Sequence, residues 1–430
     1  MVKKIGIIHN GCAKNLVDTE LMVGKLIEAG FETTLDIDDE NIDAYLINTC
    51  SFIHDAEKES VQAILNIAQK GKKIVVAGCL AQKYKDELLE LLPEVSSLVG
   101  VANINDIVSA FLNSDVYVSE SPCYQYPEQI ERAHITIGAS AYIKIAEGCN
   151  YTCGYCIIPK LRGKYSSRRI EDIVLEAKKL ANKGIAEIIL IAQDTTSYGV
   201  DLYGKPALAR LLEELNKIEN INWIRVLYTY PTNFDDILIE AYQKLDKVVK
   251  YIDIPLQHSH PDMLKKMLRP AIDAEKLIQK LRKAIPDVCI RTTFIVGYPT
   301  ETEEEFSHLK KFIQKMKFDR VGVFTYSKEK ASYSSSLKPR ISAKVKNKRK
   351  KELMTLQQEI SRKINEKLIG KKIPCIVEQV TPKGAIARSF RDSPDVDGVV
   401  YIKTDKQLSP LDMVEVKIVA SKEYDLWGEV

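Results

Sequence analysis

The chain has 430 residues, which is enough for about three domains of ordinary size. Hydrophobic residues make up 45% of it and charged residues 28%, which excludes a mainly disordered protein, and the formal net charge of +3 is too small to indicate nucleic-acid binding by itself. No apolar run is long enough to cross a membrane and the first residues do not resemble a secretory signal, so we expect a cytoplasmic protein without a membrane partner.

Residues 1–118 alternate between short apolar strands and amphipathic helices. Three strands are predicted, at 5–8, 44–49 and 73–78. Gly30 ends the helix that follows the first of them, as a residue that tolerates positive φ commonly does. The alternation predicts an α/β domain with a doubly wound parallel sheet. The polar, irregular residues 119–140 are predicted to form a linker.

The same alternation continues through residues 141–340. Six strands are predicted there, at 142–146, 187–193, 223–228, 251–257, 289–296 and 320–326. Because helical stretches lie between these strands, we expect a partial (β/α)6 barrel, which is incomplete relative to the eight-stranded barrel. Thr300 with Glu303 forms a capping-box pattern that predicts the start of the last long helix of this domain.

The final part of the chain first becomes strongly basic and then becomes rich in short β-strand patterns. Residues 341–372 contain eleven basic and three acidic residues, which predicts a basic connecting helix over 341–370. This helix either lies in solvent or contacts RNA. Residues 371–430 form short β-rich runs with nine basic and ten acidic residues, and they predict a small β-barrel.

The nine cysteines indicate chemistry, because an odd number in a chain without an export signal favours metal binding or catalysis over disulfides. Cys149, Cys153 and Cys156 form a C-x3-C-x2-C loop directly after a predicted strand. Three thiolates this close can bind three irons of a 4Fe–4S cluster and leave the fourth iron without a protein ligand. A structural zinc site would need a fourth ligand, and packed core cysteines would not need to gather in a loop.

Cys12, Cys50 and Cys79 share a position, because each of them comes just after a predicted strand. The carboxyl ends of parallel strands meet at one edge of a sheet, where doubly wound folds bind ligands. The three thiols are therefore candidates for a second, convergent cluster. Small buried cysteines of the core would show the same pattern, so the residues alone leave both interpretations open.

The loop EGCNYTCGYCIIP resembles the radical S-adenosylmethionine (SAM) superfamily, including the aromatic Tyr155 before its last cysteine. The resemblance implies that the open iron binds SAM and that electron transfer splits it to a 5′-deoxyadenosyl radical. It also implies SAM contacts at Tyr155, at Gly297 in the loosely matching FIVGYPTE, and at Gln193, unless Gln193 merely ends a strand. His258 and His260 are interpreted as loop residues, because six thiolates already satisfy two clusters.

The segments GCAKNLVDTE, NTCSFIHDA and VVAGCLAQ resemble the N-terminal domain of the methylthiotransferase family. The order of the predicted domains also matches that family, which ends in a TRAM barrel. The resemblance implies that Cys12, Cys50 and Cys79 hold a second 4Fe–4S cluster. The remaining cysteines are interpreted as structural, and they are Cys123, Cys289 and Cys375.

The family has one branch that modifies an aspartate of small ribosomal subunit protein 12 and another that modifies adenosine in transfer RNA. Lys14 stands where the RNA branch usually has methionine. The protein branch is resembled by three further segments, AQDTTSYG, YTYP and ARSFRDSPDVDG. Ala13 departs from the residue that is commonest in the protein branch, proline. Asp392, Asp395 and Asp397 predict an acidic surface that repels phosphate and suits a basic ribosomal protein, unless they only shape a turn.

The resemblance implies that one SAM methylates a sulfur species at the second cluster and another yields the radical that removes hydrogen from the aspartate β-carbon. It implies three partners: the ribosomal protein, free or in the ribosome, a sulfur donor, and a low-potential electron donor such as flavodoxin or ferredoxin. The alternatives are a methylthiotransferase for N6-isopentenyladenosine or threonylcarbamoyladenosine in transfer RNA, an iron–sulfur electron carrier, and a zinc-binding RNA module. A carrier would need neither the large central domain nor an open iron.

Overall fold

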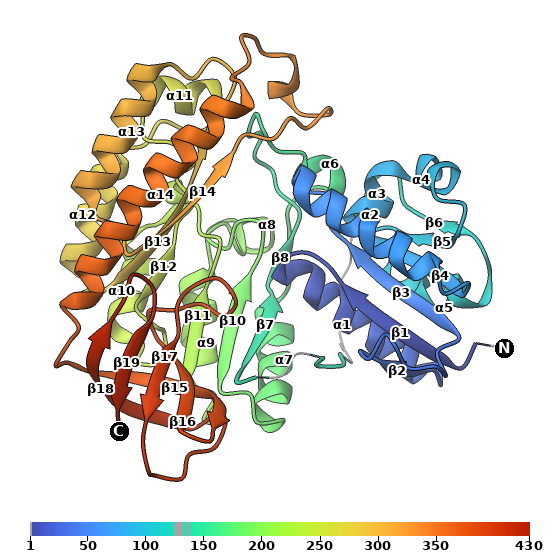
Figure 1. The fold of residues 1–430 in the computed structure, drawn as a ribbon, viewed down its shortest axis with the longest axis horizontal. Coiled ribbons are helices and arrows are strands. Elements are labelled where there is room, and N and C mark those ends of the chain that lie inside the picture. The colour runs from blue at the N-terminus through green and yellow to red at the C-terminus, as the bar shows by residue number, and fades with distance from the viewer. Residues whose placement is uncertain (1, 124–131, 136–137) are drawn as a thin grey trace. The chain divides into compact units, whose positions relative to one another are not determined.

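Figure 1 shows the chain as a computed structural model, which describes residues 2–123, 132–135 and 138–430. The contacts within the chain divide it into two compact units. The first unit comprises 1–135, 146–151 and 156–168, and the second comprises 136–145, 152–155 and 169–430. The two units are described separately. In the described part of the chain, no helix is both long and apolar enough to span a membrane.

The described residues of the first unit form a parallel sheet with the strand order β2-β1-β3-β4-β5-β6. Its strands are β1 (Lys4–His9), β2 (Glu32–Thr34), β3 (Ala44–Thr49), β4 (Lys73–Gly78), β5 (Val95–Val99) and β6 (Val116–Tyr117). The predicted strands 44–49 and 73–78 coincide with β3 and β4 in every residue. The predicted parallel sheet of the N-terminal domain is therefore confirmed.

Helices flank this sheet, and their apolar faces account for its buried core. They are α1 (Ala13–Glu28), α2 (His54–Ala68), α3 (Cys79–Tyr84), α4 (Asp86–Leu91), α5 (Ile107–Leu112) and α6 (Ile158–Arg162). Tyr45 and Ile47 of β3 share a buried cluster with Ile64 of α2 and Leu80 of α3. Alternate residues of β3 thus pack against one face of α2, which is the packing that the sequence pattern predicts.

The second unit contains two three-stranded parallel sheets, ordered β11-β10-β7 and β12-β13-β14. Their strands are β7 (Ser140–Lys144), β10 (Glu187–Ile191), β11 (Trp223–Val226), β12 (Tyr251–Asp253), β13 (Cys289–Val296) and β14 (Arg320–Thr325). Backbone hydrogen bonds from Val249 to Ile224 and from Thr229 to Asp253, each 3.0 Å, connect the two sheets across β11 and β12. The six strands follow one another in chain order, which confirms the predicted partial barrel.

Five of the six predicted barrel strands end earlier than the sequence suggests, and β11 and β12 show the reason. The prediction extends to 228 and 257, whereas β11 ends at Val226 and β12 at Asp253. Tyr228 and Gln257 have positive φ values of 59° and 70°, so the backbone turns out of the extended conformation before the apolar pattern stops. The carboxyl ends of these strands are therefore shaped as loops.

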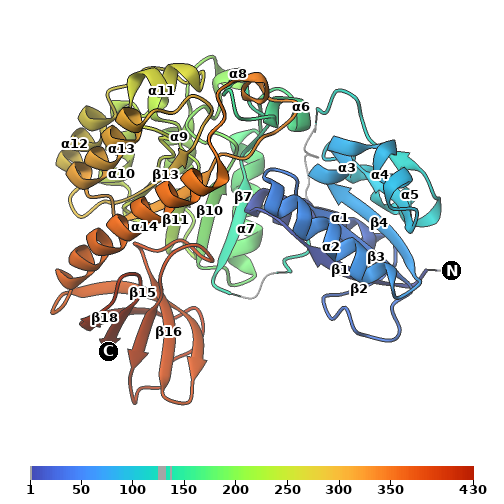
Figure 2. The ribbon, with the colours of Figure 1, turned by 45° about the horizontal axis from the view of Figure 1, so that its top comes forward.

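The helices of the second unit follow its strands, as the βα alternation predicts (Figure 2). They are α7 (Ile170–Asn182), α8 (Val200–Tyr203), α9 (Leu208–Asn216), α10 (Asp236–Lys244), α11 (Pro261–Lys266), α12 (Ala274–Ala284), α13 (Glu303–Met316) and the basic helix α14 (Ala343–Glu366). In the first unit, β8 (Ala146–Glu147) and β9 (Ser166–Ser167) form a short antiparallel pair.

The last strands of the described chain form a closed barrel in the order β15-β16-β17-β19-β18. These strands are β15 (Lys372–Thr381), β16 (Gly384–Ser389), β17 (Val400–Lys403), β18 (Met413–Ser421) and β19 (Leu426–Glu429). Alternate residues such as Cys375, Val377 and Val416 fill the interior. The prediction of a small C-terminal β-barrel is confirmed. The predicted boundaries at 118, 140, 340 and 370 remain predictions.

The capping-box prediction is wrong by two residues. The capping pair of α13 is Thr302 with Glu305, because the Thr302 hydroxyl accepts from the Glu305 amide at 3.2 Å and the Glu305 carboxylate accepts from the Thr302 amide at 2.7 Å. Thr300 instead has a φ of 73° and belongs to the preceding turn. The stretch TETEEE repeats threonine and glutamate, so spacing alone offers two registers.

The prediction of an acidic surface at Asp392, Asp395 and Asp397 is wrong for Asp392 and Asp397, and only Asp395 is exposed. Asp392 is buried and accepts a hydrogen bond from Arg320 at 2.6 Å. Asp397 accepts from the Tyr251 hydroxyl at 2.6 Å and lies 3.7 Å from Arg291. These carboxylates pair with arginines of the partial barrel, so they hold the loop in place and do not present negative charge to a partner.

Candidate functional site

The three N-terminal cysteines lie at the carboxyl ends of neighbouring strands. Cys12 caps α1 three residues after β1, Cys50 directly follows β3, and Cys79 begins α3 directly after β4. Because β1, β3 and β4 are adjacent in the parallel sheet, the structure brings these positions to one edge, as the sequence predicts. Cys50 and Cys79 are buried, and Cys12 is partly exposed.

Asn15 of α1 connects the three cysteine loops. The thiols of Cys12 and Cys79 both point to its Oδ1, at 3.9 and 3.8 Å, and its Nδ2 donates to the carbonyl of Thr49 at 2.8 Å. Thr49 precedes Cys50 in the chain. A single buried amide thus contacts the thiols of Cys12 and Cys79 and the backbone that precedes Cys50.

Glycines allow the loops to approach so closely. Gly11 has a φ of 118°, and a Cβ there would lie 2.9 Å from the Cβ of Cys50. Gly78 has a φ of 93°, and a Cβ there would lie 2.6 Å from the carbonyl oxygen of Thr49. Both positions need a positive φ and the missing side chain, so Cys12 and Cys79 each follow a residue that must be glycine.

Arg162 of α6 is a functional candidate that the sequence reasoning missed. Its buried guanidinium donates to the sulfur of Cys79 at 3.5 Å and to Asn15 Oδ1 at 2.6 Å. The other terminal nitrogen donates to Asp18 at 3.1 Å and to Glu147 at 2.9 Å. No pattern along the chain connects α6 with α1, so only a signal from the fold could have found this residue.

The pKa values of the three thiols depend on burial and on the charges of the side chains around them. Burial raises the pKa of Cys50 to about 12, and negative charge at Cys79 adds to this effect. Burial also raises the pKa of Cys79, although Arg162 opposes it. At Cys12, Lys14 and Arg162 outweigh burial and lower the pKa. Thiols must be deprotonated to bind metal, so a metal bound by these cysteines would displace protons.

The donor set is appropriate for an iron–sulfur cluster. Thiolate sulfur is the ligand that holds such clusters, and each cysteine binds a different iron, so the sulfurs surround the cluster instead of meeting at one atom. Cys12, Cys50 and Cys79 supply three mostly buried thiols at one edge of the sheet.

The second cysteine loop, 149–156, falls in both units, so its residues are described singly. In the first unit, the Cys149 amide donates to the Gly163 carbonyl at 3.1 Å, and the Cys156 sulfur accepts from the Ile158 amide at 3.4 Å. In the second unit, the neighbouring Gly154 donates to the Met267 carbonyl at 2.8 Å. The backbone around the cysteines is thus fixed by hydrogen bonds on both sides of the loop.

Arg269 lies beside the middle of this loop and was also missed. One terminal nitrogen is 3.8 Å from the Cys153 sulfur and donates to the Tyr155 hydroxyl at 3.2 Å. The other donates to the Pro255 carbonyl at 3.0 Å, and the guanidinium lies 4.4 Å from the centre of the Tyr230 ring. Arg269 follows α11 without a recognisable motif, so the sequence gives no signal for its role.

The other predicted SAM contacts lie in the second unit after its strands. Gln193 is half-buried, two residues beyond β10. Gly297 follows β13 with a φ of 72°, its amide donates to Glu301 at 2.6 Å, and a Cβ there would lie 2.3 Å from Cγ of Lys346. Glycine is thus required for packing at this position. The roles of Gln193 and Gly297 in SAM binding remain predictions.

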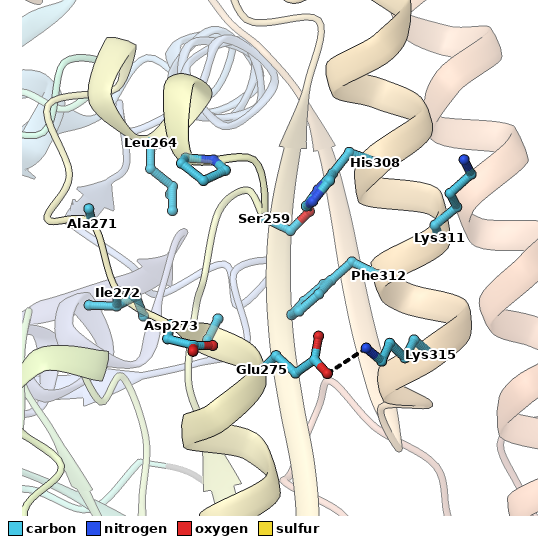
Figure 3. A pocket seen from close by; sticks show the side chains of 12 residues that line it. Ser259, Leu264, Ala271, Ile272, Asp273, Glu275, His308, Lys311, Phe312 and Lys315 are labelled. Carbon is cyan, nitrogen blue, oxygen red and sulfur yellow. Dashed lines mark hydrogen bonds and ion pairs between the residues drawn. The ribbon is translucent and has the colours of Figure 1, made fainter.

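The two histidines of the motif LQHSHP have structural partners. His258 is buried with its Nε2 3.4 Å from Glu301, and the His260 ring accepts from the Asp262 amide at 3.3 Å and caps α11. Nearby, a pocket of about 580 Å³ lies between α11, α12 and α13 (Figure 3). None of the predicted cluster or SAM residues lines this pocket, whose walls include Phe312 and the ion pair of Glu275 with Lys315.

Three family models match successive parts of the chain. Residues 4–100 match the uncharacterized protein family UPF0004, residues 143–313 match the radical SAM superfamily, and residues 369–430 match the TRAM domain. These segments contain the cysteine edge of the first unit, strands β10 to β13 of the partial barrel and the C-terminal closed barrel.

Three full-length relatives carry the same name, ribosomal protein uS12 methylthiotransferase RimO. The relative from Caldanaerobacter subterraneus subsp. tengcongensis is 46% identical, with 100% of each chain covered. The relative from Gloeobacter violaceus is 44% identical, covering 100% of this chain and 99% of its own, and that from Synechococcus elongatus is 45% identical, covering 99% and 95%. The chain belongs to the RimO family. Membership confirms the predicted class, a radical SAM methylthiotransferase that uses SAM and 4Fe–4S clusters, and does not favour the transfer-RNA branch.

A solved structure shares the fold at low identity. The radical SAM methyltransferase TsrM from Kitasatospora setae, solved with cobalamin and a 4Fe–4S cluster, is 14% identical, with a TM-score of 0.56 and coverage of 78% of this chain and 77% of its own. At this identity the likeness supports only the arrangement of strands and helices, which agrees with the predicted fold.

Proposed function

We propose that this chain attaches a methylthio group to the β-carbon of an aspartate in ribosomal protein uS12. The observation that carries the proposal is the identity of 44–46% to RimO enzymes along nearly the whole of both chains. Such identity covers all three domains at once, so it includes the sites for both clusters and the C-terminal barrel. The transfer-RNA alternative lacks comparable support.

We assign the six cysteines to two 4Fe–4S clusters. Cys12, Cys50 and Cys79 hold the N-terminal cluster, which the convergence of their loops on Asn15 supports. The cysteines of the loop 149–156 hold the radical cluster, which their C-x3-C-x2-C spacing supports. When bound, the clusters and SAM supply the electron, the radical and the transferable sulfur that protein side chains cannot provide.

The protein's own residues position these groups and keep water away. Arg269 fixes the radical loop by contacting both Cys153 and Tyr155. We assign Tyr155, Gln193 and Gly297 to the SAM site. Tyr155 lies in the cysteine loop, Gly297 lies in a segment that loosely matches the superfamily pattern, and Gln193 lies two residues after β10. Because Cys50 and Cys79 are 6% and 5% exposed, the protein excludes bulk water from most of the N-terminal thiols.

The exposed face of α14 supports an RNA contact when uS12 lies in a ribosomal particle. Lys344, Lys348 and Lys351 are exposed at helical spacing. Lys346 and Arg349 instead turn inward, to the Tyr326 carbonyl and to Glu301. Phosphate contacts are sensitive to salt, so this proposal predicts that rising salt weakens modification of small subunits more than modification of free uS12. A sulfur donor and a flavodoxin or ferredoxin complete the proposed partners.

The deciding experiment is mass spectrometry of uS12 from cells with and without this protein. We expect one methylthio group on a single aspartate, present only when the intact chain is present. Unmodified uS12 together with new methylthioadenosine in transfer RNA would overturn the proposal and assign the chain to the other branch.

A further inference from the structure

Arg162 occupies an unusual position for a buried cation. Its side chain is 2% exposed, and one terminal nitrogen is already satisfied by two carboxylates, Asp18 at 3.1 Å and Glu147 at 2.9 Å. The other terminal nitrogen donates to Asn15 and to the sulfur of Cys79 at 3.5 Å. An ion pair that served stability alone would be complete with the carboxylates. The second terminal nitrogen of Arg162 is an additional donor, and it points to Cys79, which is a predicted cluster ligand.

Hydrogen bonds to cluster sulfurs and the net charge near a cluster both influence its reduction potential. A guanidinium is permanently protonated, and its effect on charge is strong where water is excluded. Donation to a thiolate sulfur withdraws electron density from the iron–sulfur bond, and the positive charge favours the extra electron of the reduced cluster. Both effects raise the reduction potential.

We propose that Arg162 is a positioning residue that raises the reduction potential of the N-terminal cluster. The inference rests on the proposed assignment of Cys12, Cys50 and Cys79 as ligands of that cluster. Asp18 and Glu147 hold the guanidinium so that its second nitrogen faces Cys79, and they offset part of its charge. The carboxylates therefore act in the opposite direction to Arg162.

The test uses the full chain with Cys149, Cys153 and Cys156 changed to alanine, so that only the N-terminal cluster assembles. In this background, Arg162→Gln and Arg162→Lys are compared with native Arg162 by redox titration followed by electron paramagnetic resonance. We expect the midpoint potential to fall in R162Q, and to fall less in R162K, which keeps the charge but loses the planar fork. Arg169→Gln is the matched control, because Arg169 is exposed and pairs with Asp172.

The variant Asp18→Asn keeps Arg162 and removes one of its counter-charges. The proposal predicts that D18N raises the midpoint potential, which is a change of opposite sign to that of R162Q. This variant and R162K also decide the question if R162Q does not assemble a cluster. Unchanged potentials in D18N and R162K, with full iron and sulfide content, would overturn the inference.

The failure of the underlying assignment would look different. If the background chain with native Arg162 bound no iron or sulfide, the assignment of Cys12, Cys50 and Cys79 would be wrong. If that chain held a cluster whose potential did not respond to the Arg162 and Asp18 substitutions, the assignment would stand and only the role of Arg162 would be rejected.

Discussion

At the scale of single residues, the cysteines of the two proposed clusters make separate and testable contributions. Cys153 lies in the loop proposed for SAM cleavage and contacts Arg269. Cys50 lies between β3 and α2, where Ser60 hydrogen bonds to both its amide and its carbonyl at 3.0 Å. Each thiol can be removed without touching the other loop.

Replacing Cys153 with alanine removes one ligand of the radical cluster. We expect loss of one cluster per chain and of SAM cleavage to background, because the electron for cleavage comes from that cluster. Iron analysis and assay of 5′-deoxyadenosine measure both effects. Cys123→Ala is the control, because Cys123 is exposed and belongs to neither proposed ligand set. Cleavage at the native rate in reconstituted C153A would show that the radical assignment is wrong.

Cys50→Ala should have a different outcome, because it affects only the proposed sulfur-carrying cluster. We expect 5′-deoxyadenosine to form still, while methylthiolated uS12 falls to background. The measurement is product mass on uS12 beside the nucleoside assay in the same reaction. Normal yield of methylthiolated uS12 from this variant would exclude the second cluster as the sulfur site.

Glu187 shows how one buried carboxylate makes stability depend on pH. Burial alone would raise its pKa, but Arg225 and Arg388 outweigh burial and lower it to about 2. A lowered folded-state pKa gives stability that is present above the unfolded value near 4.5 and is lost as the pH falls toward 2. We expect this group to contribute roughly 3 kcal/mol to the difference between pH 6 and pH 2.

Denaturant unfolding of the native chain and of Glu187→Gln across this range measures the effect. E187Q should be less stable at pH 6, because it leaves two buried arginines without their shared carboxylate, and its stability should fall less steeply with acid. Parallel curves for the two proteins would contradict the assigned pKa.

At the scale of elements, local patterns predict strands and helices well where one register dominates. The strands 44–49, 73–78 and 289–296 match the observed bounds, and the last two end at or directly before a glycine with positive φ, Gly78 and Gly297. The capping box fails because Thr300 and Thr302 each have a glutamate three residues later. Only the left-handed backbone at Thr300 selects the second register.

Thr302→Ala should destabilise the chain by about 1 kcal/mol, because it removes the hydroxyl that caps α13. Thr300→Ala is the matched control and should change the free energy of unfolding much less, since this hydroxyl has no hydrogen-bond partner in the structure. Denaturant unfolding compares the two. A larger loss in T300A than in T302A would restore the register that the sequence suggested.

At the scale of the whole molecule, the loop between β16 and β17 attaches the C-terminal barrel to the partial barrel. Asp392 pairs with Arg320, Arg391 pairs with Asp319, and the Cys289 thiol donates to the Arg391 carbonyl at 3.3 Å. The motif ARSFRDSPDVDG ends β16 and continues through this loop. Asp392 and Asp397 are used for attachment within the chain, so Asp395 is the one exposed aspartate of the three that were predicted to form an acidic surface.

Arg320→Ala leaves Asp392 buried without its cation, so we expect destabilisation by about 3–5 kcal/mol. Lys217→Ala, which breaks the exposed pair with Glu214, is the control and should cost about 0–1 kcal/mol. Thermal unfolding measures both. Equal melting temperatures for R320A and K217A would show that the buried pair does not attach the barrel.

The sequence by itself determined the parallel sheet, the partial barrel, the small closed barrel and the positions of the six cysteines, because periodicity and ligand spacing are local properties of a chain. The tertiary structure alone decided which charges meet. Arg162 and Asn15 are 147 positions apart, and Arg320 and Asp392 are 72 apart. Whether a charged residue faces solvent, a cluster ligand or a buried counter-ion depends on such long-range contacts, and no pattern along the chain records them.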